Sequence, residues 1–536
     1  MQLAIIHYHL NRGGVAQVIQ NHLGALAAQP AERRPVRVLI VHGPGRDAWP
    51  EEVVPGGAPF AIDYAELPEL AYDAEPRADA DRLAAALGAA LAAEGFDRNA
   101  TVLHTHNHAL GKNASLPGAL ALLAGEGWRH LLQCHDFAED NRPENYRHLA
   151  EALQAESLKA GDPHRLGAKL YPQAPQIHYA TLTERDAAVL AEAGVAAERL
   201  SALPNPAAGL GSLPSQAEAR GPVFEKLGLP AEARLVVYPV RGIRRKNLGE
   251  MLLLAALAPS DTWFAVTLAP KNPVELLSFD RWRRVAESLG LRCRFDTGGA
   301  YGVGFHDALA AADAIVTTSI AEGFGMVFLE AWLAGRPLIG RDLPEITREF
   351  RAAGMTLGGL WERLSVPLAL LKDPRSAREG LRTVYQDTCE QYGVKPLGAE
   401  EAERRLGVCL EGDAIDFGQL TTAGQCELLA AAAQDAGVRR ALLDANPGLA
   451  EKLRASAEAS ADEIGANARV VRSVYSAETL GERLAATYAE VLGSDSSAAV
   501  ESLNKGEAIL AHFLTPERVY HVRIEPWDPS KTESPS

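Results

Sequence analysis

Hydrophobic and polar positions along the first 206 residues alternate between two rhythms. Short runs rich in valine, isoleucine and leucine predict strands, and the longer stretches between them carry apolar residues at helical spacing. The predicted strands are residues 3–8, 36–41, 102–106, 131–135 and 178–183, and the predicted helices include 15–28, 81–94 and 184–193. Apolar strands that alternate with helices predict a parallel sheet covered by helices on both faces.

The same pattern restarts after a polar, proline-containing stretch at residues 213–222. Further strands are predicted at 234–238, 263–268, 292–296, 313–318 and 336–339. We therefore expect an α/β chain with two doubly wound, Rossmann-like domains. The predicted division is 1–212, 213–480 with a helical insertion at about 358–450, and 481–536 as a closing helix (480–492) and a C-terminal tail.

Composition and charge exclude several classes of protein. A chain of 536 residues with 47% hydrophobic and 23% charged residues is globular and too long for a single core. Its net charge of −16 argues against nucleic acid and anionic membranes as partners. The five cysteines show no CxxC spacing, and no apolar run has the length of a membrane span. These features predict a cytoplasmic protein without stable membrane insertion.

Residues 313–345 carry the strongest functional signal. A predicted strand leads into a loop with Glu322 and the sequence Gly323-Phe324-Gly325-Met326, and an apolar helix with Glu330 in its middle follows. A buried carboxylate needs hydrogen-bond donors, because leaving it unpaired costs several kcal/mol. A neighbouring arginine or backbone amides would satisfy Glu330 without any function. The nearby Glu322 and glycines favour a ligand, since α/β folds bind ligands beyond the carboxyl ends of parallel strands.

A basic loop follows the first predicted strand of the second domain. The strand meets the sequence Arg241-Gly-Ile-Arg244-Arg245-Lys246-Asn247, with four cations in six residues. Such a cluster is expensive unless an anion compensates it, and Arg and Lys together suit a diphosphate. A solvated basic loop is the alternative, which so acidic a protein makes less favourable.

Glycines and histidines follow strands of the first domain. Gly13 and Gly14 join the first strand to its helix, where a phosphate or sugar could approach the backbone, although a plain tight turn fits equally well. His135 ends a strand and is predicted to face a ligand cleft. The sequence His-Thr-His-Asn-His at 104–108 has spacing that a metal could use, but we expect it to line the same polar cleft. Asp79 and Asp81 have the DxD form of metal-dependent transferases, and a helix cap explains them better.

These motifs together resemble the retaining glycosyltransferases of the GT-B fold, specifically the family-4 type. The resemblance rests on Gly13–Gly14, His135, the PNP turn at 204–206, the Arg241/Lys246 pair, and Glu322-x7-Glu330 with its EGFG sequence. It implies two Rossmann-like domains that face each other across a cleft, with the acceptor on the N-terminal side and a nucleotide-sugar donor on the C-terminal side. The segment at 358–450 departs from the family pattern.

The resemblance also implies a role for each site residue. Arg241 and Lys246 hold the donor diphosphate, Glu330 takes the ribose hydroxyls, and His135 lies near the reacting carbon. Glu322 and the amides of Gly323, Phe324, Gly325 and Met326 hold the donor sugar, while Gly13 and Gly14 approach the phosphates. No cofactor and no metal are implied beyond the nucleotide-diphosphate sugar itself.

The implied reaction is hexosyl transfer, with retention, to a hydroxyl acceptor. We expect a small-molecule or saccharide acceptor in solution, because no basic amphipathic helix that could dock on a membrane is evident in the N-terminal half. A glycoside phosphorylase or disaccharide synthase of the same fold is an alternative, and a non-catalytic sugar-nucleotide-binding protein is a second. The base, the sugar and the oligomeric state have no signature in the sequence.

Overall fold

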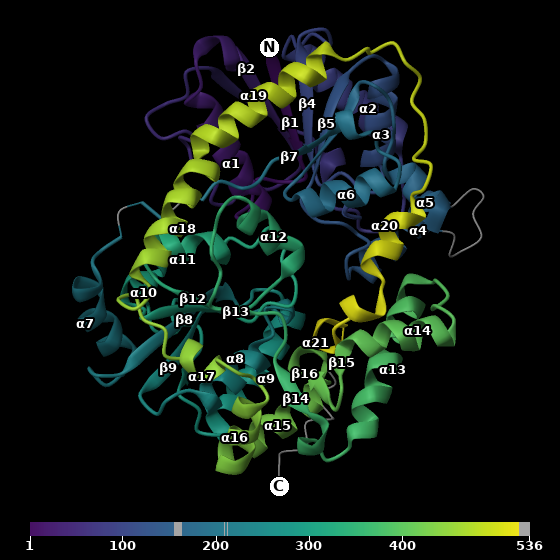
Figure 1. Cartoon of the computed structure of the whole chain (residues 1–536). Helices are drawn as coiled ribbons and strands as arrows, with labels where there is room; N and C mark the ends of the chain where they lie inside the picture. Colours follow the sequence, from purple (N-terminus) through teal and green to yellow (C-terminus); the bar gives the residue numbers. More distant parts are fainter. Residues whose placement is uncertain (155–162, 208–209, 212, 525–536) are drawn as a thin grey trace. The chain divides into compact units, whose positions relative to one another are not determined.

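The computed structural model describes residues 1–154, 163–207, 210–211 and 213–524 (Figure 1). The chain forms two compact units, each built around its own parallel sheet. Unit 1 comprises residues 1–206, 388–395 and 474–515, and unit 2 comprises 207–387, 396–473 and 516–536. The prediction of two doubly wound α/β domains is confirmed. The end of the predicted tail, 525–536, lies outside the described residues.

Unit 1 contains a seven-stranded sheet in the order β3-β2-β1-β4-β5-β6-β7, in which every neighbouring pair is parallel. Its strands are β1 (Gln2–His7), β2 (Arg37–His42), β3 (Ala61–Glu66), β4 (Thr101–His106), β5 (Arg129–Cys134), β6 (Ile177–Thr181) and β7 (Leu200–Ala202). Its helices are α1 (Gly14–Ala27), α2 (Ala80–Ala93), α3 (Leu116–Gly125), α4 (Pro143–Gln154), α5 (Pro163–Leu170), α6 (Glu184–Glu192), α19 (Ala477–Gly493) and α20 (Glu507–Phe513).

Both faces of this sheet are buried because successive apolar residues of each strand point to opposite sides. In β1, Leu3 and Ile5 pack in the core with α1 and α19, whereas Ala4 and Ile6 pack in the core with α2 and α3. Continuous apolar strands of this kind are stable only between two helical layers. The hydrophobic pattern therefore dictates the doubly wound arrangement.

The predicted closing helix, α19, belongs to unit 1 and packs along α1 (Figure 1). Its buried residues recur at helical spacing, at Leu480, Leu484, Tyr488 and Val491. The two helices cross at Gly481, where a Cβ atom would lie 2.4 Å from the carbonyl oxygen of Ala25. Only glycine permits so close a crossing. The C-terminal part of the chain thus completes the core of the N-terminal domain.

Unit 2 contains a six-stranded parallel sheet in the order β10-β9-β8-β11-β12-β13. Its strands are β8 (Arg234–Arg241), β9 (Thr262–Leu268), β10 (Cys293–Arg294), β11 (Ala314–Thr317), β12 (Leu338–Arg341) and β13 (Leu360–Trp361). The helices of this sheet are α7 (Gln216–Leu227), α8 (Leu248–Leu257), α9 (Pro273–Ser288), α10 (Phe305–Ala311), α11 (Val327–Leu333), α12 (Pro344–Ala352) and α18 (Ala461–Val474).

The predicted insertion is helical with a small antiparallel sheet of order β14-β16-β15. Its elements are β14 (Ser365–Pro367), α13 (Pro374–Tyr392), α14 (Ala399–Leu406), β15 (Leu410–Glu411), β16 (Ala414–Asp416), α15 (Thr422–Gln434), α16 (Ala436–Asp444) and α17 (Leu449–Lys452), and the short α21 (His521–Ile524) comes near the end of the chain. Helix α15 packs on α8, and its residues Leu428 and Leu429 lie in the core of unit 2. Most of the insertion is therefore part of the second domain's core.

Several predicted boundaries need correction. The stretch 213–222 is not a simple linker, because most of it belongs to α7, which starts with a capping box between Ser215 and Glu218 and accommodates Pro222. The strand expected at 292–296 is reduced to β10, and the start of the expected insertion includes β13, the edge strand of the main sheet. The half-exposed strand β3 and the short β7 were not predicted, since neither has a continuous apolar run.

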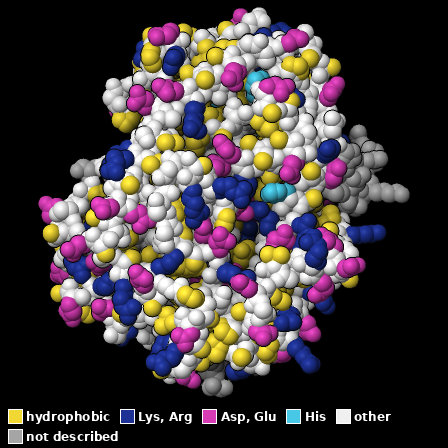
Figure 2. Space-filling model, viewed as in Figure 1, with side chains coloured by type: hydrophobic (Ala, Val, Ile, Leu, Met, Phe, Trp, Pro, Cys, Tyr) yellow, Lys and Arg dark blue, Asp and Glu magenta, His cyan; other side chains and the backbone are white. Residues whose placement is uncertain are grey.

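No helix among the described residues is both long enough and apolar enough to cross a bilayer. On the face shown in Figure 2, acidic and basic side chains are interspersed over most of the area.

Candidate active site

The unit 2 sheet has a topological switch point between β8 and β11, where the strand order reverses. Loops that leave such adjacent strands toward opposite faces form the ligand crevice of open α/β sheets. The loop after β8 carries Arg244, Arg245 and Lys246, and the loop after β11 carries Glu322 and the glycines. The two segments selected from the sequence are therefore neighbours at the one position where a doubly wound sheet binds ligands.

Hydrogen bonds join these two loops directly. The Thr318 hydroxyl donates to the carbonyl oxygens of Lys246 (2.9 Å) and Asn247 (3.2 Å), and the Ile320 amide donates to the carbonyl of Arg245 (3.0 Å). Beneath them, the hydroxyls of Tyr238 and Ser319 lie 2.7 Å apart. The backbone that carries the cations is thus fixed by the strand that leads to Glu322.

Lys246 and Glu322 form a buried ion pair between the loops. The Lys246 ammonium donates to Glu322 Oε1, which also accepts from the Ser319 hydroxyl at 2.6 Å, and Arg245 Nη2 lies 3.9 Å from Oε2. Burial lowers the pKa of Lys246 despite this partner, whereas Lys246 and Arg245 hold the pKa of Glu322 below its usual value against the effect of burial. Removing either partner would leave an uncompensated buried charge.

The basic cluster is only partly compensated within the protein. We expected the four cations to require an external anion. However, Glu275 already accepts a hydrogen bond from the Arg244 amide (2.6 Å) and pairs with the Arg244 guanidinium (3.2 Å), and Glu322 forms an ion pair with Lys246. The side chain of Arg241, at the exposed carboxyl end of β8, has no hydrogen bond or ion pair within the described part of the chain. Arg241 and, in part, Arg245 are therefore the cations of this loop that remain able to pair with an external anion.

Glu330 is a half-buried carboxylate on α11, the helix that follows the glycine loop. Burial raises its pKa to about 7, and the positive charge of Lys246 only partly opposes this. Among the residues that the structure describes, none donates a hydrogen bond to the Glu330 carboxylate, and no arginine pairs with it. The non-functional explanations of this carboxylate thus find no support.

Glu250 shows how the fold treats a buried carboxylate that has only a structural role. It lies on the apolar helix α8 with 0% exposure, and Arg341 donates to it from Nη2 (2.6 Å) and Nε (3.0 Å). Asn247 (2.8 Å) and Trp361 (3.3 Å) donate to it as well. Glu250 is fully satisfied, whereas Glu330 is not.

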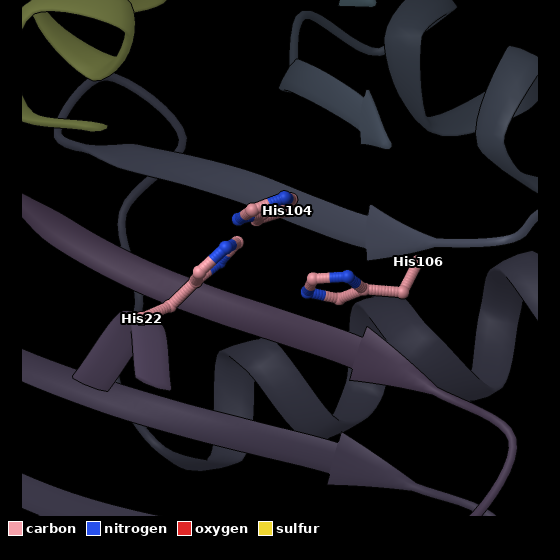
Figure 3. A group of neighbouring side chains, drawn as sticks. All are labelled: His22, His104 and His106. Atoms are coloured by element: carbon pink, nitrogen blue, oxygen red, sulfur yellow. The ribbon is translucent and has the colours of Figure 1, made fainter. Parts of the chain in front are cut away.

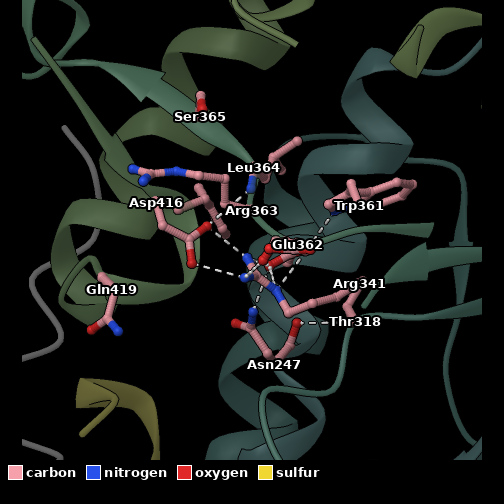
Figure 4. Close-up of polar contacts among 12 residues, drawn as sticks. Asn247, Thr318, Arg341, Trp361, Glu362, Arg363, Leu364, Ser365, Asp416 and Gln419 are labelled. Atoms are coloured by element: carbon pink, nitrogen blue, oxygen red, sulfur yellow. Dashed lines mark hydrogen bonds and ion pairs between the residues drawn. The ribbon is translucent and has the colours of Figure 1, made fainter. Parts of the chain in front are cut away.

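Arg341 is held in turn by Asp416 of the insertion (Figure 4). Two nearly parallel hydrogen bonds join the guanidinium to the Asp416 carboxylate, at 2.7 and 2.8 Å. Although burial opposes it, Asp416 and Glu250 raise the pKa of Arg341 well above its usual value, so it stays charged. Because Glu250 also holds the side chain of Asn247, this network supports the backbone immediately after Lys246.

The loop at 323–326 offers backbone donors next to Glu322. The amides of Gly323, Gly325 and Met326 donate to no other described residue. Gly325 has φ +84°, and a Cβ there would lie 2.6 Å from the Phe328 ring, so this position requires glycine. The Phe324 ring is buried against Phe350, with centroids 5.8 Å apart. The amides of Gly323, Gly325 and Met326 are thus available to a ligand, whereas the Phe324 side chain is a core residue.

Gly13 and Gly14 lie exposed at the start of α1 in unit 1. Gly13 has φ −169°, which any residue can adopt, and a Cβ built on Gly14 would meet no atom within 4 Å. Neither the backbone conformation nor the packing of the protein itself therefore requires glycine here.

His135 follows β5 in unit 1 and is only 6% exposed. Its Nε2 lies 2.8 Å from Nδ1 of His106, and its backbone amide donates to Asn107 Oδ1 at 2.8 Å. Burial lowers the pKa of His135 to about 4, so the imidazole is neutral at pH 7. Asn107 adopts a left-handed conformation with φ +57° and was not singled out from the sequence.

The predicted role of the His-Thr-His-Asn-His sequence is wrong. His104, His106 and His108 are all 0% exposed, so they lie in the interior and do not line an open cleft. The error arises because the strand pattern gives the direction of each side chain but not the depth at which helices cover it. The helix-cap interpretation of Asp79 is confirmed, since Asp79 Oδ1 accepts from the Arg82 amide at 3.1 Å.

The sequence analysis missed the residues that support the site. Ser319 and Thr318 are ordinary polar residues at a strand end, and nothing in their local pattern shows that they link two loops. Glu250 could have been found, because it is a single carboxylate in an apolar helix, the same signal that selected Glu330. Its partners Arg341 and Asp416 lie too far along the chain to be identified in that way.

Comparison with known proteins gives one curated relative and many similar folds. No protein-family model matches the chain. The mannosylglucosyl-3-phosphoglycerate synthase of Petrotoga mobilis is 25% identical over 435 residues, which cover 77% of this chain and 78% of that protein.

Sucrose-phosphate synthase from Thermosynechococcus elongatus has a similar structure, with a TM-score of 0.51 and 16% identity over 91% of this chain and 98% of that one. Anabaena Alr3699/HepE, solved in complex with UDP and glucose, gives a TM-score of 0.46 and 13% identity over 91% of this chain and 99% of that one. The likeness to sucrose-phosphate synthase confirms the predicted GT-B fold.

We expect Glu330→Gln and Glu250→Gln to have opposite effects on the ligand-free protein. Burial without a partner penalises the Glu330 carboxylate, so the neutral amide should leave the melting temperature unchanged or higher. Because the folded-state pKa is about 7, above the ordinary carboxyl value of 4.5, the penalty grows as the pH rises from 4.5 through 7, and the difference should be largest at about pH 8. Glu250→Gln breaks a buried pair and should cost about 3–5 kcal/mol.

Thermal and urea melts of the three proteins, followed by tryptophan fluorescence, provide the measurement. A fall in stability for Glu330→Gln as large as that for Glu250→Gln would show that Glu330 has a structural partner.

Proposed function

We propose that the chain, which has the GT-B fold and a glycosyltransferase relative, moves a hexosyl group, with retention, from a nucleotide-diphosphate sugar to a hydroxyl acceptor in solution. The donor site is at the switch point of the unit 2 sheet. The observation that carries this assignment is Glu330, a half-buried carboxylate without a protein partner beside Lys246 and the glycine loop. The two adjacent hydroxyls of a ribose would donate to this carboxylate the hydrogen bonds that no described residue provides.

The remaining charges at the switch point suit a diphosphate. The Arg241 side chain has no partner among the described residues, and the nearest carboxylate to Arg245, that of Glu322 at 3.9 Å, already binds Lys246. A dianionic diphosphate bound next to these residues would balance the remaining positive charge of the loop. The free amides of Gly323, Gly325 and Met326 would then donate to the sugar hydroxyls, next to Glu322. Gly13, Gly14 and His135 are the proposed contributions of unit 1 to the same reaction.

In this mechanism the bond between the sugar carbon and the diphosphate oxygen breaks, and a bond from that carbon to the acceptor oxygen forms. Negative charge develops on the departing diphosphate, where Arg241 and the partly compensated Arg245 stabilise it, next to the ion pair of Lys246 with Glu322; one preorganised donor of this kind is worth about 3 kcal/mol. Lys246 and Ser319 both donate to the Glu322 carboxylate, which lowers its nucleophilicity. As the resemblance to retaining family-4 enzymes implies, we propose that the acceptor attacks on the face that the diphosphate leaves and that its proton passes to the diphosphate oxygen.

The relative in Petrotoga mobilis suggests the class of acceptor. Its name describes the synthesis of a glycoside of 3-phosphoglycerate, which carries both phosphate and carboxylate groups. We propose that the acceptor here is also a small anionic saccharide. The lack of a basic amphipathic helix in the N-terminal half is consistent with an acceptor that is not embedded in a membrane.

A panel of GDP-, UDP- and ADP-hexoses, with glucosyl-3-phosphoglycerate and neutral sugars as acceptors, tests this function. We expect transfer from one nucleotide class, release of the nucleoside diphosphate, and a product whose anomeric configuration matches the donor. Product formation from a sugar 1-phosphate, with release of inorganic phosphate and no requirement for nucleotide, would instead identify a phosphorylase. A complete lack of turnover and binding with all the donors would overturn the proposal.

Arg241→Ala should lower kcat/KM by about 10²–10³ without changing the melting temperature, because the side chain is exposed and binds nothing in the protein. Arg244→Ala is the matched control. It removes the same charge from the same loop, but from a residue that Glu275 already compensates, so its effect should be less than about tenfold. Equal losses in both variants would point to a general effect of loop charge and contradict the diphosphate role of Arg241.

Transfer should continue after treatment with EDTA. Arg241, Arg245 and Lys246 supply positive charge where a Mg²⁺ or Mn²⁺ ion would otherwise neutralise the diphosphate, and Asp79 caps a helix. Initial rates should be measured with EDTA and then with an excess of Mg²⁺ or Mn²⁺. Loss of activity that either ion restores would show that the donor diphosphate needs a metal.

A further inference from the structure

Three histidines meet in the interior of unit 1, and one of them, His106, is hydrogen-bonded to His135. They are His22 on α1, which is 1% exposed, and His104 and His106 on β4, which are 0% exposed. One nitrogen from each ring lies within 4.8 Å of one nitrogen from each of the others (Figure 3). The group consists of imidazoles alone.

The fold explains why the three rings meet. Residues 104 and 106 are two apart on a strand, so their side chains leave the same face of the sheet. Helix α1 packs on that face, and His22 is on its buried side. The ring centroids of His104 and His106 are 4.3 Å apart, and the His22 ring is 5.6 and 5.7 Å from them.

Several ring nitrogens of this group have no hydrogen-bond partner among the described residues. Neither nitrogen of His22 has a partner, nor does Nε2 of His106, among the residues described. Leaving a buried polar atom unsatisfied costs about 1–3 kcal/mol. His106 does have a partner on its other nitrogen, His135, and His104 bonds both Gln133 Oε1 (2.9 Å) and the Tyr488 hydroxyl (2.8 Å). The unbonded nitrogens therefore belong to His22 and His106, whereas both nitrogens of His104 are bonded.

We propose that His22, His104 and His106 bind a transition-metal ion of the zinc type, which fastens α1 to β4. Imidazole ligands suit zinc, cobalt, nickel and copper, whereas magnesium and manganese prefer oxygen. A zinc–nitrogen bond is about 2.0–2.1 Å long, so the nitrogens must move together. Among the described residues, no hydrogen bond opposes such a movement of the His22 ring.

The outer partners that a metal-binding histidine needs are already present. Such a residue normally donates its second ring N–H to a neighbouring acceptor, which fixes its orientation. His135 can serve His106 in this way, and Gln133 can serve His104 once the hydrogen bond to Tyr488 is exchanged for the metal. The proposal rests on the burial and proximity of the three imidazoles, so it does not depend on the proposed function.

Metal analysis of the intact, untagged protein tests the site. We expect about one equivalent of zinc after gel filtration or after titration with Zn²⁺, a higher melting temperature with Zn²⁺ bound, and the visible absorption of a nitrogen-bound ion when Co²⁺ is substituted. His22→Gln should lose all three properties.

His130→Gln is the matched control, because His130 is likewise 0% exposed with neither nitrogen bonded, yet it is not part of the group. This variant should bind zinc as the wild type does. The proposal is overturned if wild-type protein neither contains zinc nor responds to Zn²⁺ and Co²⁺, or if His22→Gln binds them as tightly as the wild type. Because the wild-type measurement is decisive by itself, the test stands even if His22→Gln fails to fold.

Discussion

The ion pair between Lys246 and Glu322 is the interaction on which the switch point of the second sheet depends. Both side chains are buried at the ends of adjacent parallel strands, where an unpaired charge would cost several kcal/mol. Two residues directly after β11 fix this arrangement. The Ser319 hydroxyl donates to the Glu322 carboxylate, and the Thr318 hydroxyl donates to the Lys246 carbonyl oxygen. Once these two charges cancel, the described residues leave Arg241, at the strand end, and Glu330 without a partner, and Arg245 only partly compensated. That remainder defines what the site can bind.

Glu250 and Glu330 illustrate how far the sequence alone can be interpreted. Each is a single carboxylate on an apolar helix after a strand of the same sheet, and from sequence they are equivalent. In the structure Glu250 is fully bonded by Arg341, Asn247 and Trp361, whereas Glu330 has no donor among the described residues. The difference depends on Arg341, which is 91 residues away in the chain. Local pattern identifies buried charges, but only the fold decides which of them are already paired.

The same limit explains the other differences between prediction and structure. The strands and helices of both sheets follow from hydrophobic periodicity, because a strand buried on both faces must be apolar throughout. The depth of His104 and His106 could not be predicted, since it depends on α1 and α19, and α19 comes from the far end of the chain. His22 showed no signal at all, because its partners lie on a different element. The insertion appeared separate from the fold, yet Asp416 connects it through Arg341 and Glu250 to the loop that carries Lys246.

The pH dependence of nucleotide-sugar affinity tests most directly whether Glu330 awaits a ligand. Burial raises its pKa to about 7, and the ionised carboxylate is the form that accepts two hydroxyl hydrogen bonds. Isothermal titration calorimetry with the donor sugar nucleotide should therefore show affinity that increases between about pH 6 and pH 8 for the wild type, while Glu330→Gln binds more weakly with a flatter profile. Profiles of equal affinity and equal slope for the two proteins would contradict the assignment of Glu330 to the donor.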